Sequence, residues 1–354
     1  MEIQNIFSLF DTDDTLLSRE KFGNGHINYT YLVSGKKNKY IIQKINTTIF
    51  DNPVELMKNI RLVTEYVSEA IKKEGSDEKV LKVVKTKEGK DLALVDGGAY
   101  RMYYFVDNSV CYEQIERPLD FYNCGYAFGK FATQLDGFDA NLLYPVIPNF
   151  HNTVSRFEKF EDALAKDVCG RAASVKNEIE FFISRKSICN KITSLLDSGE
   201  MPSRVTHNDT KLNNILFSSE TGKPFAVIDL DTVMAGSVCY DFGDSIRFGC
   251  NTAAEDEPDT SRVGFSVELF KAYVEGYLKG FDKITKIEKD HLLWGAILMT
   301  YECGMRFLTD YLSGDTYFHI SRENHNLDRA RTQMRMVELM EQNFDELQSI
   351  IDNA

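Results

Sequence analysis

The chain has 354 residues, of which 43% are hydrophobic and 27% are charged, and its formal net charge is −13. This length and composition are typical of a soluble globular protein with two lobes or domains. The negative charge argues against nucleic acid or an anionic membrane as a partner.

The seven cysteines are odd in number and form no C-x-x-C pair. This pattern disfavours a zinc site or a disulfide framework and favours a reducing cytoplasm. We expect no secretory signal, because the first residues lack a basic stretch followed by an apolar one. No apolar run is long enough to predict a membrane span. We therefore expect a cytoplasmic monomer.

The first part of the chain predicts a β-rich lobe. Residues 1–20 are mixed and polar and favour a short helix and a loop. The run Gly23-Asn24-Gly25 then precedes alternating apolar residues that end before a turn at 34–38, and residues 40–45 form the return strand. Such a loop can lay backbone N–H groups over phosphates, although Gly-Asn-Gly also makes ordinary turns.

The return strand is expected to carry a basic residue for the phosphates of a nucleotide. Gln43 and Lys44 are the candidates, and they point to opposite faces of the strand. A helix begins at Asn52-Pro53, since asparagine caps helices well and proline suits the first turn. Glu55 and Glu65 on this helix are both conceivable partners for a phosphate-binding lysine, and the sequence does not choose between them.

Residues 80–86, 92–95 and 100–106 are also strand-like, which gives five strands and one helix in an N-terminal nucleotide-binding lobe over 1–107. We expect 104–109 to be a hinge whose backbone binds adenine, with Tyr104 and Phe105 at its start. From residue 118 the apolar spacing becomes helical. Helices are predicted from 118 to 135 and over 152–168, 174–197, 241–248, 264–281, 288–312 and 322–350. Residues 108–354 therefore predict a larger helical lobe.

A polar stretch with short strands interrupts this helical part. Val205 opens a strand, residues 207–213 form a polar loop, and strands at 215–217 and 225–228 flank a hairpin turn. Asp209, Asn214 and Asp229 are thereby brought close together. Two carboxylates and an amide suit Mg²⁺. The spacing also follows the kinase pattern H-x-D-x-x-x-x-N, in which the Asp receives the proton of the substrate hydroxyl.

Other polar residues of this stretch keep two interpretations each. Lys211 either reaches the γ-phosphate as a catalytic residue or is a solvated loop lysine. Asp231 either touches a second metal or caps the following turn. His207 either takes part in the chemistry or only braces the loop. Asp241 lies near the start of a predicted helix, where capping is its ordinary role.

Four runs carry a resemblance to a known family. They are His207-Asn-Asp-Thr-Lys-Leu-Asn-Asn214, Val-Ile-Asp229-Leu-Asp-Thr-Val-Met, Tyr240-Asp-Phe-Gly-Asp-Ser-Ile-Arg247-Phe-Gly and Tyr301-Glu-Cys-Gly-Met-Arg306-Phe-Leu-Thr-Asp-Tyr-Leu. The sequence resembles the aminoglycoside phosphotransferase and choline kinase superfamily, and within it the N-acetylhexosamine 1-kinases. The resemblance implies an α+β, protein-kinase-like fold of two lobes that uses ATP and Mg²⁺. It also implies that Gln43 faces the cleft, that Lys44 lies outside it, and that Asp241 braces the catalytic loop.

The resemblance further implies that Arg247, Arg306 and Tyr317 contact a sugar, and that the anomeric hydroxyl of an N-acetylhexosamine is phosphorylated. The runner-up is a kinase of the same fold for an amino alcohol or an aminoglycoside, and a catalytically silent sensor is a third alternative. An acidic run, which contains Glu255, Asp256, Glu257 and Asp259, keeps a cationic acceptor open. The sequence leaves open the epimer, the anomer and the choice of ATP over GTP.

Overall fold

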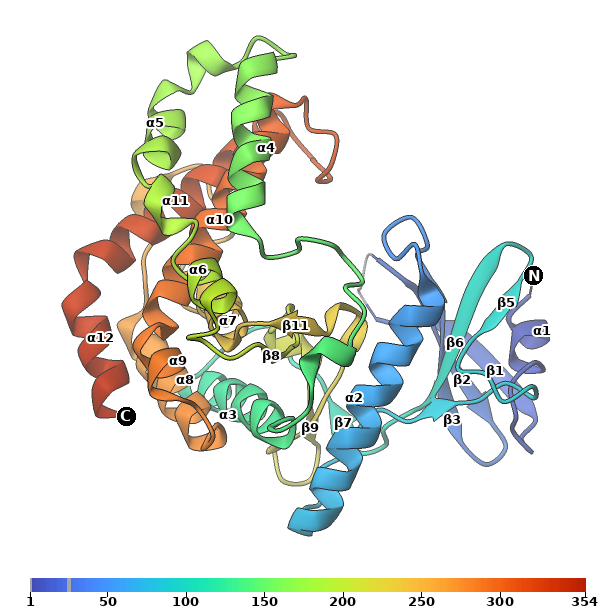
Figure 1. Cartoon of the computed structure of the whole chain (residues 1–354). Coiled ribbons are helices and arrows are strands. Elements are labelled where there is room, and N and C mark those ends of the chain that lie inside the picture. Colours follow the sequence, from blue (N-terminus) through green and yellow to red (C-terminus); the bar gives the residue numbers. More distant parts are fainter. Residues whose placement is uncertain (1, 24–26) are drawn as a thin grey trace. The chain divides into compact units, whose positions relative to one another are not determined.

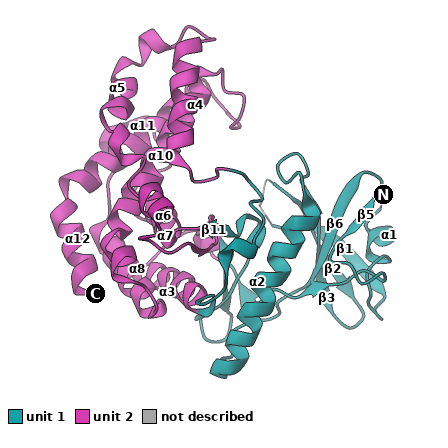
Figure 2. Ribbon diagram, viewed as in Figure 1, with its two compact units in different colours: residues 1–111, 134–148, 214–235 teal, residues 112–133, 149–213, 236–354 magenta. Residues whose placement is uncertain are grey.

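The computed structural model describes residues 2–23 and 27–354 (Figure 1). The chain divides into two compact units (Figure 2). Unit 1 contains residues 1–111, 134–148 and 214–235, and unit 2 contains residues 112–133, 149–213 and 236–354. The predicted α+β class is confirmed, because an antiparallel sheet dominates the N-terminal part and helices dominate the rest.

The main sheet of unit 1 has the strand order β1-β2-β3-β6-β4, with β5 also paired to β6, and all its pairs are antiparallel. Its strands are β1 (Leu16–Lys21), β2 (Tyr29–Gly35), β3 (Lys39–Ile45), β4 (Val83–Val84), β5 (Ala93–Val95) and β6 (Gly98–Tyr104). The sequence predicts a loop where β1 lies. This strand is almost entirely exposed, so it lacks the apolar alternation that identifies a half-buried strand.

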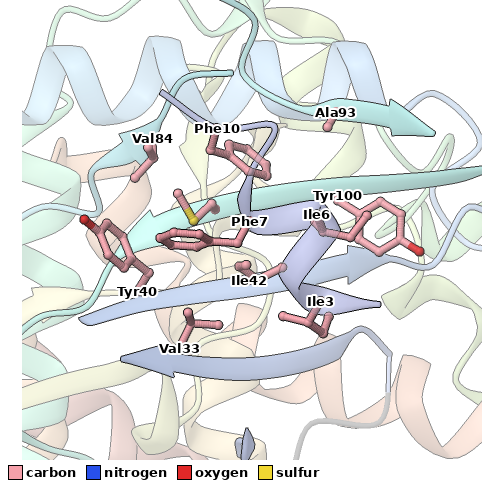
Figure 3. Close-up of a cluster of buried hydrophobic side chains, with 11 residues drawn as sticks. Ile3, Ile6, Phe7, Phe10, Val33, Tyr40, Ile42, Val84, Ala93 and Tyr100 are labelled. Carbon is pink, nitrogen blue, oxygen red and sulfur yellow. The ribbon is translucent and has the colours of Figure 1, made fainter. Parts of the chain in front are cut away.

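One face of this sheet packs against the short helix α1 (Ile3–Phe7). Figure 3 shows Ile6 and Phe7 of this helix, with Phe10 just after it, against Val33 and Ile42 of the strands. All of these side chains are buried. Burial of this apolar surface is the main force that fixes α1 on the sheet.

Helix α2 (Pro53–Glu74) begins and ends as its sequence predicts. The Asn52 side chain accepts a hydrogen bond from the N–H of Glu55, and Pro53 occupies the first turn. Gly75 ends the helix in the left-handed conformation, at φ 64°. Its apolar stripe, which includes Leu56 and Ile60, is fully buried.

Unit 1 also contains a three-stranded sheet in the order β10-β9-β7. Its strands are β7 (Ser109–Val110), β9 (Ile215–Ser218) and β10 (Pro224–Val227), and the predicted hairpin joins β9 to β10. The remaining elements assigned wholly or mainly to unit 1 are η1 (Ala140–Leu142), η5 (Leu230–Thr232) and β11 (Met234–Gly236).

Unit 2 is mainly helical. Its elements are α3 (Pro118–Gln134), α4 (Thr153–Lys166), η2 (Ala172–Ser174), α5 (Lys176–Ser184), η3 (Lys186–Ile188), α6 (Thr193–Ser198), β8 (Arg204–Thr206), η4 (Leu212–Asn214), α7 (Val238–Gly249), η6 (Thr260–Arg262), α8 (Val267–Gly280), α9 (Lys286–Asp290), α10 (Leu292–Leu312), α11 (His325–Gln342) and α12 (Phe344–Asn353). Within the described ranges, none of the helices combines the length and the apolar composition that crossing a bilayer requires.

Three predicted helices are interrupted. The helix expected over 174–197 is divided by η3, the one over 288–312 is divided at His291, and the one over 322–350 is divided at Asn343. Apolar spacing continues through these points, so it does not indicate the interruptions.

Helices α7 and α10 approach each other closely through glycine. A Cβ on Gly243 would lie 2.3 Å from the carbonyl oxygen of Gly295, and one on Gly295 would lie 2.2 Å from that of Cys239. The absence of side chains at both positions therefore lets the two helices pack closely. Helix α7 carries the buried Asp241, Asp244 and Arg247, and α10 carries the buried Glu302 and the half-buried Arg306.

Candidate active site

The β9–β10 hairpin brings two predicted metal ligands to adjoining positions. Val227 pairs with Ile215, and the next backbone N–H, that of Ile228, donates to the carbonyl oxygen of Asn214 at 2.9 Å. Asp229 follows directly with φ 58°, which is uncommon for a residue with a side chain and is often found at functional sites. Carboxylate and amide oxygens are ligands that Mg²⁺ accepts, so this pair fits the expected ion.

Asp231, the third expected ligand, is held in a buried ion pair. The Arg101 guanidinium donates to both of its oxygens, with Nη2 at 2.9 Å from Oδ2. Asn28 Nδ2 donates to the same Oδ2 at 2.7 Å. Burial disfavours the charge of Arg101, but the Asp231 carboxylate outweighs this effect and the pKa of Arg101 is raised. In this arrangement both oxygens of Asp231 are engaged by protein groups.

Gln43 lies on the same face of the sheet as Arg101, directly opposite it in the strand register. Its Oε1 accepts from Arg101 Nε at 2.8 Å, and its Nε2 donates to Thr30 Oγ1 at 3.0 Å. Lys44 points to the other face and is exposed. The acidic candidates on α2 contact other cations: Glu55 pairs with Lys58 at 3.0 Å, and Glu65 pairs with Arg61 at 3.1 Å.

The expected nucleotide-binding residues are placed as follows. Gly23 has φ 75°, and a Cβ added to it would meet no atom of the described residues within 4 Å; Asn24 and Gly25 lie outside those residues. The N–H of Tyr104 donates to the Lys82 carbonyl at 3.0 Å, and that of Phe105 donates to the Lys39 carbonyl at 2.9 Å. These two N–H groups are thus already bonded within unit 1, so adenine would have to use other backbone groups of the expected hinge.

In unit 2, Asp241 braces the loop that carries Asp209. Its carboxylate accepts the backbone N–H groups of His207 and Asn208, both at 2.7 Å, and its carbonyl accepts the Thr210 hydroxyl at 2.6 Å. Burial raises the pKa of Asp241, and the nearby His207 and the two N–H donors oppose this effect. The bracing implied by the family resemblance is confirmed.

Asp241 does not cap α7. The N-cap is Ser237, whose hydroxyl accepts a hydrogen bond from the N–H of Cys239 at 3.1 Å. His207 is fully buried, and its ring packs edge-on against Phe128 at 5.4 Å. Its ring Nδ1 also accepts from the N–H of Asp209 at 3.3 Å. These contacts favour the bracing interpretation of His207.

Asp209 and Lys211 form an ion pair at 2.7 Å, and about a third of each side chain is exposed (31% and 35%). Burial alone would lower the pKa of Lys211, but the Asp209 and Asp244 carboxylates outweigh it and the pKa is raised. Lys211 is therefore a positively charged partner of the predicted base and not a freely solvated lysine.

Arg247, the first expected sugar contact, is buried on α7 between two acidic side chains. Its Nε and Nη2 donate to Asp244 Oδ1 at 3.1 and 2.9 Å, and its Nη1 donates to Glu255 at 2.9 Å. Burial opposes the charge of Asp244, but Arg247 and Lys211 outweigh it and the pKa of Asp244 is lowered. Lys211 and Arg247 thus lie near one carboxylate.

Arg306 and Tyr317, the other expected sugar contacts, lie on and after α10. The half-buried Arg306 guanidinium lies 5.4 Å from the centre of the Phe318 ring, and Tyr317 is 73% exposed. Asp310 holds this segment, since its carboxylate accepts the N–H groups of residues 316–318 at 2.8–2.9 Å. Burial alone would raise the pKa of Glu302, but its hydrogen bond with His151 and, to a smaller extent, the charge of Arg306 act in the other direction, and the pKa is lowered.

Each carboxylate of the acidic run has a partner within unit 2. Glu255 pairs with Arg247 at 2.9 Å, Asp256 with Arg322 at 3.5 Å, and Glu257 with Arg262 at 3.2 Å. Asp259 accepts the N–H of Ser261 at 3.1 Å and caps η6. The run is thus largely compensated by local cations and a backbone donor.

Several residues of these networks are not singled out in the sequence. Asn59 and Arg101 in unit 1 lie outside the quoted motifs, whereas Glu302 and Asp310 in unit 2 lie within the run 301–312, and all four are buried polar residues with specific partners. The sequence does offer a signal that Arg101 is paired, because a charged residue inside an apolar strand is rarely buried without a partner. The other three lie inside helical stripes where a polar residue can equally face solvent.

Comparison with solved structures finds the same fold in small-molecule kinases. An aminoglycoside phosphotransferase from Alicyclobacillus acidocaldarius is 12% identical and has a TM-score of 0.63, with 100% of this chain and 97% of that one covered. A microcompartment-associated aminopropanol kinase is 15% identical, with a TM-score of 0.58 and 98% and 97% covered. A choline kinase from Cryptosporidium parvum is 12% identical, with a TM-score of 0.54 and 95% and 92% covered.

Among curated sequences, an uncharacterised kinase-like protein of Caenorhabditis elegans is 32% identical over 143 residues, which are 40% of this chain and 32% of that protein. The chain therefore matches about a third of that relative's length. The sequence profile described as the phosphotransferase enzyme family matches residues 18–284, which are most of the chain. The chain therefore belongs to the phosphotransferase enzyme family, and its fold is similar to the folds of a solved aminoglycoside phosphotransferase and a solved choline kinase.

Proposed function

We propose that the chain is an ATP- and Mg²⁺-dependent sugar 1-kinase. It transfers the γ-phosphoryl group of ATP to the anomeric hydroxyl of an N-acetylhexosamine, N-acetylglucosamine or N-acetylgalactosamine, and gives the sugar 1-phosphate and ADP. Membership of the phosphotransferase family supports the reaction class. The arrangement of charged side chains in unit 2 supports the class of acceptor.

The protein groups have separate roles in this proposal. Asp209 orients the acceptor hydroxyl and accepts its proton, which suits a carboxylate on a loop fixed by Asp241. Lys211, the ion-pair partner of Asp209, contacts the γ-phosphate. Asn214 and Asp229 hold Mg²⁺, which neutralises negative charge on the phosphates when it is bound.

The remaining predicted residues bind the two substrates. The loop that contains Gly23, Asn24 and Gly25 covers the phosphates, Gln43 lies near them, and the segment that begins at Tyr104 and Phe105 binds adenine. Arg247, Arg306 and Tyr317 contact the sugar. Phosphoryl transfer needs mainly positioning and charge neutralisation, so these contacts account for the kind of catalysis that the family carries out.

The observation that favours a sugar over a cationic acceptor is the compensation of the acidic run. Glu255, Asp256 and Glu257 pair with arginines of unit 2, so they do not form an open anionic site. The half-buried Arg306 would repel an ammonium group but can donate to hydroxyl and acetamido oxygens. An uncharged, oxygen-rich acceptor is therefore the better match.

Asp209→Asn tests the proposed reaction. We expect kcat to fall by about 10²- to 10⁴-fold, because general-base catalysis is typically worth that much, while the melting temperature and the ATP affinity stay near those of the wild type. Asp162→Asn, an exposed change on α4, is the matched control and should leave kcat unchanged. If Asp209→Asn turns over like the wild type, Asp209 is not the base. If the wild type binds nucleotide but phosphorylates no acceptor, a catalytically silent sensor takes the place of the kinase.

A further inference from the structure

Two side chains from different elements of unit 1 hold the segment that follows Asp229. From β6, Arg101 donates to both oxygens of Asp231. From α2, the fully buried Asn59 donates to the Val233 carbonyl at 3.1 Å. The residues at 231 and 233 are thus fixed on the C-terminal side of Asp229. A carboxylate two residues from a fixed point has little freedom to move along the chain.

The position of the Arg101 guanidinium in the sheet differs from the common kinase arrangement, in which a lysine on the third strand pairs with a glutamate of the following helix. Here the third strand carries neutral Gln43, and the positive charge lies opposite it on β6. The helix supplies the amide of Asn59 and the sulfur of Met57, which lies 4.0 Å from Arg101 Nη1. A lysine at 43 would place a second, partly buried cation beside Arg101, which like-charge repulsion disfavours.

We infer that Arg101 is a positioning residue for the metal site: by holding Asp231 it fixes the conformation in which Asp229 binds Mg²⁺. This inference rests on the proposed function and deepens it. Groups that orient a ligand without touching the metal typically change metal affinity by about 10- to 100-fold when they are removed.

The geometry favours a brace over a direct phosphate contact. The Arg101 side chain is 2% exposed. Its Nη1 and Nη2 donate to Asp231, and its Nε donates to Gln43.

The same geometry distinguishes the brace from a second metal site at Asp231. If Asp231 were a ligand, removal of Arg101 would release its oxygens and leave metal binding intact or stronger. If Asp231 instead serves only to hold the segment through Arg101, then removing Arg101 and removing the Asp231 carboxylate should weaken Mg²⁺ binding equally.

The test measures Mg²⁺-dependent ADP binding by calorimetry, without any acceptor or turnover. In Arg101→Met and in Asp231→Asn, we expect the gain in ADP affinity on adding Mg²⁺ to fall by at least about tenfold. ADP affinity without Mg²⁺ should change by less than about threefold, and the double variant should be no worse than either single one, because both changes break one contact. Arg61→Met, which removes an arginine paired with Glu65 on the surface of α2, is the control.

A second pair of variants keeps the test decisive if a single change prevents folding, since an unpaired buried charge is strongly destabilising. Arg101→Met with Asp231→Leu replaces the ion pair by apolar groups of similar volume and should fold, yet still lose the Mg²⁺ effect. Gln43→Lys with Arg101→Met returns the cation to β3 and should recover part of the effect relative to Arg101→Met.

The outcomes separate the inference from the proposed function. If the wild type binds ADP more tightly with Mg²⁺ and the folded Arg101 variants do so equally, the inference fails and the proposed function stands. If Asp231→Asn loses the effect and Arg101→Met keeps it, Asp231 is a metal ligand and the inference fails as well. If the wild type itself shows no Mg²⁺-dependent binding, the proposed function fails and the inference falls with it.

Discussion

Asp241 allows the most direct calculation of what one side chain does for the loop that carries Asp209, the proposed base. Its carboxylate accepts two backbone N–H groups, those of His207 and Asn208, both at 2.7 Å in a buried place. Leaving a buried donor unpaired costs about 1–3 kcal/mol. Asp241→Ala leaves two donors unpaired and should cost about 2–6 kcal/mol of unfolding free energy.

Asp241→Asn is the more informative change. The amide keeps one acceptor oxygen and turns an N–H₂ group toward the other donor, so we expect a cost of about 1–3 kcal/mol. The burial that raises the pKa of Asp241 also penalises its charge, so the neutral amide regains part of this cost. At about 2.1 cal/mol/K of unfolding entropy per residue, a cost of this size should lower the melting temperature of a 354-residue chain by roughly 1–4 °C.

The same change should lower activity more than stability explains. Asp209 follows the braced residues directly, and a displacement of about 1 Å in a catalytic group can cost about 10²-fold in rate. We therefore expect the kcat of Asp241→Asn, measured at a temperature well below the melting temperature of the variant, to fall about a hundredfold. Both KM values should change less. Thermal melts and steady-state kinetics measure the two effects, with the exposed Glu275→Gln on α8 as control. A variant with the wild-type melting temperature and the wild-type kcat would refute the bracing role.

Three further predictions concern the metal, the acceptor and pH. Asp229→Ala should weaken Mg²⁺-dependent ATP binding more than sugar binding, as calorimetry with each substrate would show; equal ATP affinity would move the ion to other ligands. Arg306→Ala should lower kcat/KM for the sugar by roughly ten- to a hundredfold and weaken the preference for N-acetylated sugars, whereas a larger change in the ATP KM would place Arg306 on the nucleotide side. Arg247 and Lys211 lower the pKa of Asp244 from its ordinary 3.8, so its carboxylate stabilises the fold above that pH and this contribution is lost as the pH falls below it. Melting temperatures of the wild type should therefore decline below pH 3.8, and those of Asp244→Asn should decline less; parallel curves would contradict this.

Local signals in the sequence were sufficient for much of the fold. Asn52 and Pro53 predict the start of α2 because capping depends on residues within one turn. The β9–β10 hairpin is predicted because its turn and its apolar strands are adjacent in the chain. The exposed strand β1 is missed because it has no apolar alternation. The interruptions at His291 and Asn343 are missed because the apolar spacing of the helices continues through them.

The candidate site was likewise predicted only in part from the sequence. The spacing of Asp209, Asn214 and Asp229 is readable because the kinase motif is short and continuous. The Arg101–Asp231 pair joins residues 130 positions apart, and no local pattern links them. The partners of the acidic run also come from other parts of unit 2, as Arg247 and Arg322 show. Charge compensation is a property of the folded chain, so the sequence could not decide between a neutral and a cationic acceptor.

The central claim is that the acceptor is a neutral N-acetylhexosamine phosphorylated at its anomeric hydroxyl. The most direct test incubates the wild type and Asp209→Asn with Mg-ATP and a panel of N-acetylglucosamine, N-acetylgalactosamine, the parent hexoses, ethanolamine, choline and an aminoglycoside. ADP release gives the rates, and phosphorus NMR of the product locates the new phosphate ester. The proposal predicts the highest kcat/KM for an N-acetylhexosamine, a phosphate ester at its anomeric carbon and a kcat at least about a hundredfold lower for Asp209→Asn. Turnover of the amino alcohols or the aminoglycoside, without turnover of any sugar, would contradict it.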